Sequence, residues 1–310
     1  MEASSKRTRV GRYTRAAGPA KTLTPLALDL LEFVGEFEIL SVPLLARVSD
    51  LSQKAVRRLM RVCFDHGLVS IVAVPRALLA DPSGSNSAAL AFGSAPNIFV
   101  LTAAGQKLLH DLGRLERTRP VKRYGPQNGA FLGHELLIKS VRCFLMLASK
   151  RSEQESLQQW REDADAAISL DNPGAPKQVR PDAWFTYALG NATLVAFLEA
   201  DKGTERGSAG RWRDKLTQYE ALFTSGRLKV VTGFNNARIL VIAPGAERRD
   251  RLSAFIKAQA SAFLADRFWL AEQTVLGEPS LYHPLWRRPG RNEMFPLIMP
   301  PHVGDNEAST

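Results

Sequence analysis

Apolar residues recur at helical spacing from Pro25 onward, and this pattern changes to strand-like runs further along the chain. The spacing predicts a helix over residues 26–34, a short second helix over 42–46 and a third beginning near Ser52. Two β-type runs follow at residues 67–74 and 97–101, separated by a small and polar loop around residues 81–94. Thr102 is a good N-cap for a closing helix over residues 102–109.

Three helices followed by a hairpin with a long loop is the order of elements in a winged helix-turn-helix domain. The third helix has the two faces that such a domain needs for DNA. Val56, Leu59, Met60, Cys63 and Phe64 fall on one side, and Lys54, Arg57, Arg58 and Arg61 on the other. We expect the basic side to contact double-stranded DNA. A solvated helix face, or a protein-interaction surface, would give the same pattern.

The second half of the chain alternates helical and strand-like patterns. A long helix opens at His134 and Glu135, and two runs that end near Leu189 and Gly203 read as hairpin-linked strands. Further strands are expected at residues 228–234 and 237–243, then a helix through residues 252–263 and a final short strand at 267–271. This order predicts a three-layer α/β domain with a mixed sheet, and a multi-domain α/β chain as a whole.

The positive charge is concentrated in three segments. The chain has a formal net charge of +10, and basic residues gather in residues 1–21, 114–123 and 287–291. Such clustering is typical of a protein that meets a polyanion, although solubility alone would also account for it. Within the second segment we expect Arg119, Lys122 and Arg123 to contact DNA.

Other classes of protein are disfavoured. No run of about 20 apolar residues is present, and a basic N-terminus leads into Thr22-Leu23-Thr24-Pro25, so we expect neither membrane spanning nor secretion. Cys63 and Cys143 lie far apart in apolar helical patterns, without Cys-x-x-Cys spacing for zinc. We expect both to be core thiols of a cytoplasmic protein.

Three acids lie where the predicted hairpin brings strand ends together. Glu199 and Asp201 are two residues apart on one strand, and Asp182 opens the preceding strand. Three converging carboxylates repel one another unless a cation neutralises them, which makes Mg²⁺ the candidate cofactor, with Asp182 and Glu199 as its ligands. Ordinary end-of-strand charges are the alternative, but the apolar run Leu194–Leu198 before these acids is typical of a central strand.

Pro181-Asp182 followed by Glu199-Ala200-Asp201-Lys202 resembles the signature of the PD-(D/E)XK nucleases. More narrowly, the chain resembles the bacterial replication-relaxation family of plasmids and mobile elements, from about residue 25 to 290. The motifs that carry this resemblance are His134, Arg180 to Ala183, Phe197 to Glu205, Lys215-Leu216-x-x-Tyr219 and Pro284 to Arg287. The resemblance implies metal-holding roles for Asp182 and Glu199, and an additional acid at Glu135.

The residue pattern and the resemblance together predict a domain order. It comprises a flexible basic arm over residues 1–22, a winged helix over 23–112, a basic linker over 113–130, a PD-(D/E)XK-like domain over 131–301 and a disordered tail over 302–310.

The lysine departs from the nuclease pattern, because position 201 holds Asp where the motif has Lys. A bulge at Gly203 could re-aim Lys202, or Lys215 from the following helix could enter the site. A third alternative is that no catalytic lysine is needed because the domain has become a DNA-binding platform.

Three functions follow as hypotheses. The first is a DNA-binding accessory protein of plasmid or mobile-element replication or transfer. The second is an active Mg²⁺-dependent DNA endonuclease that uses Asp182, Glu199 and a displaced lysine. The third is an adaptor whose winged helix recruits a relaxase or a replication initiator.

Overall fold

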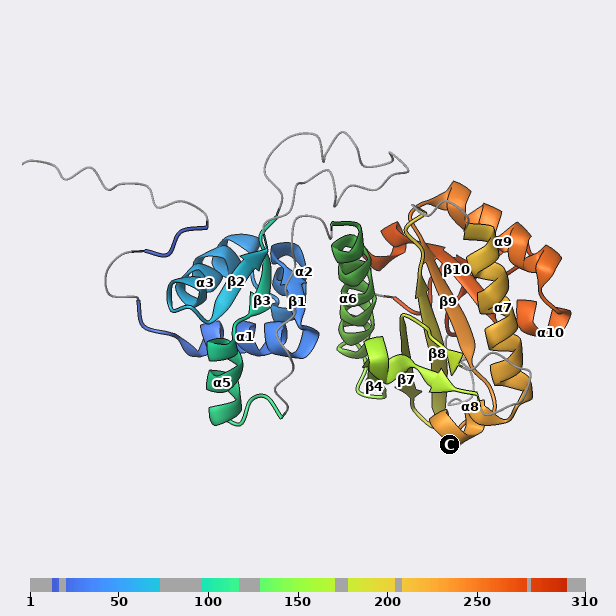
Figure 1. Ribbon diagram of the computed structural model, residues 1–310, viewed down its shortest axis with the longest axis horizontal. Coiled ribbons are helices and arrows are strands. Elements are labelled where there is room, and N and C mark those ends of the chain that lie inside the picture. Colours follow the sequence, from blue (N-terminus) through green and yellow to red (C-terminus); the bar gives the residue numbers. More distant parts are fainter. Residues whose placement is uncertain are drawn as a thin grey trace, which may run out of the picture. The chain divides into compact units, whose positions relative to one another are not determined.

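The computed structural model describes residues 13–16, 21–72, 96–116, 129–170, 178–203, 208–277 and 280–299. Most of the predicted arm, most of the predicted basic linker and the predicted tail lie outside these ranges. The chain divides into two compact units, the first ending at Lys139 and the second beginning at Ser140. Both contain helices and strands, so the expectation of an α/β chain is confirmed (Figure 1).

The first unit contains the expected helices and strands in the expected order. The elements are α1 (Pro25–Phe37), β1 (Ile39–Ser41), α2 (Val42–Ser49), α3 (Gln53–Asp65), β2 (Val69–Val72), β3 (Ile98–Leu101) and α5 (Ala103–Asp111). The strands pair antiparallel in the order β1-β3-β2. The short strand β1 was not predicted, because three buried residues between two helices carry no alternation.

Side-chain caps fix where these helices begin. Thr24, Ser41, Ser52 and Thr102 each accept a hydrogen bond from a backbone N–H three residues later. The expectation that Thr102 caps the closing helix is therefore confirmed. Its hydroxyl also donates to the carbonyl oxygen of Gly67 at 2.7 Å, which joins α5 to the turn before β2.

The second unit is built around a seven-stranded mixed sheet with the order β12-β11-β10-β9-β8-β7-β4. Strands β8, β9 and β10 run parallel to one another, and the other neighbours are antiparallel. Its strands are β4 (Glu155–Glu162), β7 (Ala183–Leu189), β8 (Ala192–Ala200), β9 (Arg238–Ala243), β10 (Phe268–Glu272), β11 (Pro284–Arg287) and β12 (Met294–Pro296). A separate pair is formed by β5 (Ile168–Ser169) and β6 (Gln178–Val179).

Helices α7 (Ser208–Thr224), α9 (Ala246–Gln259) and α10 (Ala262–Ala265) lie together on one side of this sheet (Figure 1). Their apolar side chains form one core with alternate residues of the central strands, among them Phe197, Ile239 and Phe268. Helix α6 (Gly129–Ser149) is divided between the two units, and α8 (Arg227–Thr232) follows α7. Two 3₁₀ turns, η3 (Asp163–Ala166) and η4 (Gln273–Gly277), complete the described elements.

The hairpin of β7 and β8 and the strand β9 are confirmed, but the strand expected at residues 228–234 is wrong. That segment forms α8, which begins after Gly226 (φ 75°) and ends before Gly233 (φ 82°). These two left-handed glycines delimit a short helix, and the spacing of buried Leu228 and Thr232 fits a helical turn rather than a strand.

The sheet is also wider than the pattern predicted. The segment expected to be the final strand is β10, and β11 and β12 extend the sheet beyond it. Strand β4 is an edge strand of mostly polar residues and was not predicted. The helix expected through residue 263 is interrupted, because Ser261 caps a new helix by accepting a hydrogen bond from the N–H of Leu264 at 3.1 Å. None of the described helices is long and apolar enough to cross a membrane.

Gly105 allows α5 to pack closely against the chain before β2. A Cβ atom at this position would lie 2.1 Å from the carbonyl oxygen of Leu68, which itself accepts the N–H of Thr102 at 3.0 Å. Because that contact is with backbone, the G105A substitution must displace α5, and we expect it to destabilise the first unit by about 1–3 kcal/mol. Scanning calorimetry measures this loss.

The matched control is G210A, at a helical position in α7 where an added Cβ meets nothing within 4 Å. This substitution should be neutral or stabilising by up to about 1 kcal/mol, since alanine has the higher helix propensity. Equal unfolding temperatures for G105A and the parent chain would contradict the close approach at Leu68.

Candidate functional site

Helix α3 presents a basic surface on the first unit. Lys54, Arg57 and Arg58 are exposed on it, and the opposite side of the helix is buried in the core through Val56, Leu59, Met60, Cys63 and Phe64. Burial raises the pKa of the Cys63 thiol to about 12, in keeping with the expected core thiol. The predicted separation of an apolar and a basic face is therefore confirmed.

Arg61 does not share the exposure of the other three basic residues. Its guanidinium pairs with Asp65 at 2.8 Å, donates to the carbonyl oxygen of Thr14 at 2.6 Å and lies over the ring of Phe64. Arg15 reinforces this contact by donating to the carbonyl oxygen of Phe64 at 3.1 Å. Arg61 thus holds the chain around residue 14 against the end of α3.

A hollow of about 250 Å³ lies between α3 and the small sheet. Arg57 and Arg61 line it from the helix, and Ile71, Asn97 and Phe99 line it from the strand segments. The helix therefore contributes basic residues to this hollow, and the strand segments contribute one polar and two apolar residues. The other predicted DNA contacts, Arg119, Lys122 and Arg123, lie outside the described residues.

In the second unit, strand pairing brings Asp182 beside Glu199. Ala183 is opposite Leu198 in the β7–β8 register, and the N–H of Asp182 donates to the carbonyl oxygen of Leu198 at 3.0 Å. One carboxylate oxygen of Asp182 accepts the N–H of Ala200 at 2.7 Å. Asp182 is thereby fixed to the backbone on both sides of Glu199.

Glu199 is buried, and two side chains from α7 bind its carboxylate. Lys215 forms an ion pair and hydrogen bond with Oε2, and the hydroxyl of Tyr219 donates to Oε1 at 2.7 Å. Lys215 and Tyr219 are one helical turn apart and so face the same strand end. We call these three residues, together with Asp182, the Glu199 cluster.

The electrostatics of the Glu199 cluster are set by burial. Burial raises the pKa of Glu199, the ion pair with Lys215 lowers it, and the nearby negative charge of Asp182 raises it again. Burial and the adjacent Glu199 also raise the pKa of the Tyr219 hydroxyl far above its usual value, so Tyr219 remains a hydrogen-bond donor. The lysine therefore supplies the positive charge that the two neighbouring acids require.

Asp201 has a different partner from Glu199. Strand β8 ends at Ala200, and the Asp201 carboxylate accepts the Nε–H of Arg248 on α9 at 2.5 Å and a second guanidinium N–H at 3.3 Å. Sequence reasoning missed Arg248. The available signal was an arginine pair in the first turn of a helix directly after a buried strand.

The two remaining predicted site residues are Lys202 and Glu135. Lys202 follows the end of β8, and Gly203 (φ 67°) turns the chain after it. Glu135 is buried on α6, in the part of that helix that belongs to the first unit. Of the two lysines considered from the sequence, Lys215 is the one whose amine binds Glu199.

The carboxylates do not present an open set of ligands to a metal ion. Both oxygens of Glu199 accept hydrogen bonds, and one oxygen of Asp182 accepts a backbone N–H. Within the described ranges, no group of three or more His, Cys, Asp or Glu side chains is placed to hold a metal. As arranged here, Lys215 and Tyr219 occupy both carboxylate oxygens of Glu199.

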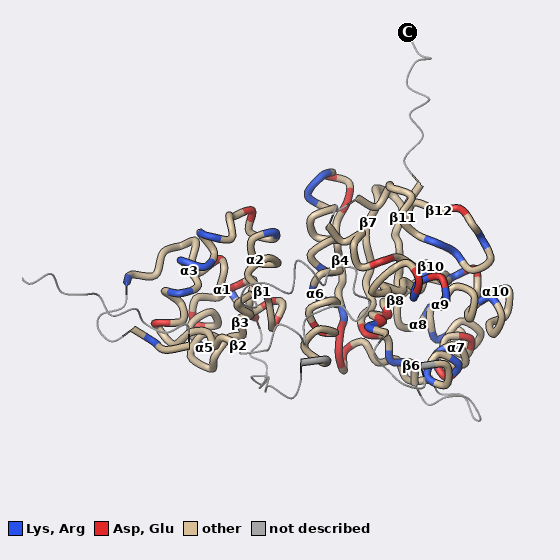
Figure 2. Tube along the Cα trace, turned by 90° about the horizontal axis from the view of Figure 1, so that it is seen from above, with Lys and Arg blue, Asp and Glu red and all other residues tan. Residues whose placement is uncertain are grey.

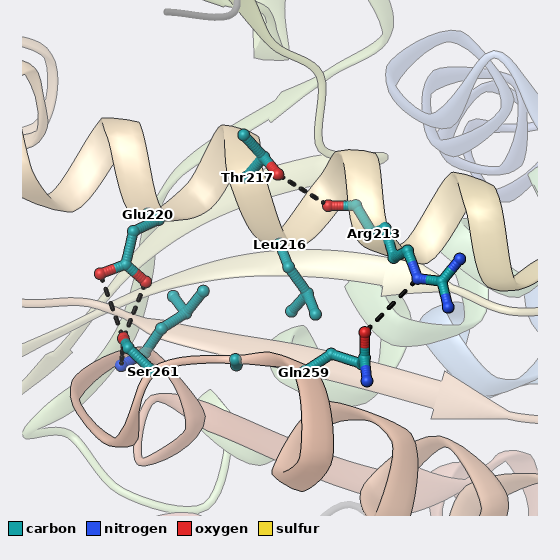
Figure 3. A pocket seen from close by; sticks show the side chains of 8 residues that line it. Arg213, Leu216, Thr217, Glu220, Gln259 and Ser261 are labelled. Atoms are coloured by element: carbon teal, nitrogen blue, oxygen red, sulfur yellow. Dashed lines mark hydrogen bonds between the residues drawn. The ribbon is translucent and has the colours of Figure 1, made fainter.

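A separate cavity of about 490 Å³ lies between α7 and the α9–α10 junction (Figure 3). Leu216 points into it, and its polar rim is already paired: Arg213 binds Gln259, and Glu220 accepts two contacts from the Ser261 hydroxyl. No residue of the Glu199 cluster lines this cavity. Its polar residues join the helices to one another.

Replacing Lys215 by Met should make stability strongly dependent on pH. Without the lysine the pKa of Glu199 rises further, and a carboxyl whose pKa is raised on folding loses stability as pH increases through that pKa. We expect K215M to lose about 3–5 kcal/mol near pH 7 and much less near pH 5. Urea unfolding followed by tryptophan fluorescence reports on this unit, because all five tryptophans lie in it.

The matched control is K229M, which removes an exposed lysine from α8. Adding E199Q to K215M should remove the pH dependence that K215M creates. Parallel stability curves for K215M and K229M between pH 5 and 8 would show that Lys215 does not neutralise Glu199.

Comparison with known proteins assigns the chain to a family. No curated protein and no solved structure matches the chain. A family model described as replication-relaxation matches residues 31–237, a range that contains α3 and all of the Glu199 cluster. Because this match covers more than half of the chain, the protein belongs to the replication-relaxation family.

Proposed function

We propose that the chain is a DNA-binding accessory protein of plasmid or mobile-element replication or transfer. The observation that carries the proposal is the exposed basic surface of α3, formed by Lys54, Arg57 and Arg58 on a helix whose other side is buried. Membership of the replication-relaxation family supports the replication theme. Double-stranded DNA is the partner, and α3 enters its major groove.

The arrangement of the first unit supports a winged-helix assignment. Helix α3 follows α2 after a short turn, and the antiparallel strands β2 and β3 come directly afterwards. In such domains the second helix of the helix-turn-helix reads the groove and the hairpin contacts the adjacent backbone. The hollow between α3 and the hairpin gives a phosphate group access to Arg57.

The arrangement of the second unit supports a nuclease-like scaffold. A helix precedes an antiparallel meander of β4, β7 and β8, and α7 then connects β8 to the parallel strand β9. Asp182 and Glu199 lie at neighbouring strand ends, as the PD-(D/E)XK resemblance implies. In this proposal Lys215 occupies the position of the neutralising cation, and the domain serves as a platform rather than as a nuclease.

The DNA-binding proposal predicts that R57A/R58A weakens duplex binding without unfolding the chain. Each arginine that contacts a phosphate contributes about 0.9 to the slope of log Kd against log salt concentration, so the slope should fall by about 2. Fluorescence anisotropy of a labelled duplex at several salt concentrations measures both affinity and slope. Arg61 is left unchanged, because it holds the chain at Thr14.

The matched control is K107A, which removes an exposed basic residue of α5 in the same unit. It should leave the salt slope close to that of the parent chain. If R57A/R58A bound DNA as tightly as K107A, α3 would not be the DNA-contacting helix. The adaptor hypothesis would be favoured instead by a different outcome. In that case the parent chain does not bind DNA, and R57A/R58A still binds a relaxase or a replication initiator.

A metal-dependent endonuclease is the second candidate, favoured by the contact between Lys215 and Glu199 beside Asp182. The test is incubation of the full chain with supercoiled, linear and single-stranded DNA in the presence of Mg²⁺ or Mn²⁺. The platform proposal predicts no cleavage above that of a D182A/E199Q preparation. Cleavage that D182A abolishes, with duplex binding retained, would replace the platform by the nuclease.

A further inference from the structure

A cluster of arginine and aromatic side chains lies at the opposite ends of the parallel strands from the Glu199 cluster. The guanidinium carbons of Arg238 and Arg288 lie 4.2 and 5.3 Å from the ring centroid of Trp269. Arg288 also lies over the ring of Phe295, which packs edge-on against Trp269. We call Arg238, Arg288, Trp269 and Phe295 the arginine cradle.

The residues of the cradle come from four strands or their ends. Arg238 begins β9, Trp269 belongs to β10, Arg288 follows β11 and Phe295 belongs to β12. Adjacent strand pairing therefore holds the two guanidinium groups on a shared aromatic support. The segment between β11 and β12 also carries Arg291, and basic positions appear in blue along it (Figure 2).

The positive charge of the cradle is only partly neutralised. Arg288 binds the carboxylate of Asp266 at 3.0 Å, but no carboxylate of the described residues pairs with Arg238. One terminal nitrogen of Arg238 is buried and has no hydrogen-bond partner in the described part of the chain. Burial, and then repulsion by Arg288, lower the pKa of Arg238 to about 10.

A buried guanidinium beside a second one has a high electrostatic cost that an anion would remove. Arginine is suited to phosphate because its planar fork donates two parallel hydrogen bonds to two oxygens. Stacking on Trp269 restrains the orientation of both forks before any ligand arrives. Trp269 is itself only 8% exposed, so its ring supports the arginines and is not open to a stacked base.

We propose that the arginine cradle binds an oxyanion of the phosphodiester class, and that this anion is a backbone phosphate of nucleic acid. The choice of nucleic acid rests on the proposed function, whereas the anion site rests on the cradle alone. The second unit then holds DNA at a surface distinct from α3. Asp182, Glu199 and Lys215 take no part in this contact.

The first arm of the test uses inorganic phosphate and the full chain. Phosphate that replaces chloride at constant ionic strength should raise the unfolding temperature of the parent chain, because a ligand that binds only the folded state stabilises it. R238Q/R288Q should lose this increase. The matched control R291Q removes an exposed arginine of the same segment and should keep it, which separates site binding from the general effect of phosphate on proteins.

R238K/R288K provides a second variant that keeps both charges but lacks the guanidinium fork, and its phosphate-dependent increase should be at most half that of the parent. An increase of equal size in the parent, R291Q and R238Q/R288Q, or none in any of them, would show that the cradle is only a packing feature and would overturn the proposal. R57A/R58A should respond to phosphate like the parent, so this arm does not depend on DNA binding by α3.

The second arm identifies the source of the anion. In the anisotropy assay with a labelled duplex, R238Q/R288Q should lower the salt slope by about 2 beyond any effect of R57A/R58A. R291Q should lower it by less than 1. Phosphate binding without any change in the DNA slope, or displacement of phosphate by polyglutamate but not by an oligonucleotide, would overturn the assignment to nucleic acid and indicate an acidic protein partner.

Discussion

The ion pair between Glu199 and Lys215 is the interaction on which the architecture of the second unit depends. Glu199 lies near the end of β8, which is flanked by β7 and β9 and so has no free edge. A carboxylate in this position cannot stay ionised without a counter-charge, and α7 supplies one. Because α7 is also the crossover between the parallel strands β8 and β9, the pair fixes the connection that makes the sheet mixed. Tyr219, one helical turn after Lys215, donates a hydrogen bond to the other oxygen of the same carboxylate.

Ion pairs between an acid at a strand end and a basic residue of a helix recur along the carboxyl ends of the parallel strands. Asp201, after β8, pairs with Arg248, and Glu272, at the end of β10, pairs with Arg249 at 2.7 Å. Both arginines belong to α9, so α7 and α9 together neutralise three acids at the ends of two strands, β8 and β10. This explains why the acids that suggest a cation site in the sequence are separately paired in the structure. Their negative charge is used to anchor helices to strands.

The sequence predicted the elements with a clear apolar pattern and missed those that lack one. Helix α3 was identified because one of its faces is apolar and the other basic, and the β7–β8 hairpin because its strands are continuous apolar runs. Strand β4 is a polar edge, and the apolar segment of α8 is delimited by two left-handed glycines, so neither carries a clear period. The position of Asp182 beside Glu199 follows from the hairpin register, to which the short turn between β7 and β8 contributes. The arginine pair at the start of α9 indicated a candidate partner for a strand-end acid, but Arg248 is 47 residues from Asp201 in sequence, and only the fold shows that these two residues meet.

The net positive charge of the chain overstates the charge that is available to a ligand, because several arginines are paired with acids. Arg61 is committed to Asp65, Arg114 to Asp29 and Glu32, and Arg287 to Asp250. All three belong to or border basic clusters in the sequence, yet each holds its own unit together. Fewer basic residues are left without an acidic partner. They include the exposed residues of α3 in the first unit and Arg238 in the second. A polyanion is attracted by uncompensated charge rather than by the count of basic residues. Within the described chain, the basic residues that pair with no acid are therefore the first positions at which the proposed nucleic acid contact is to be tested.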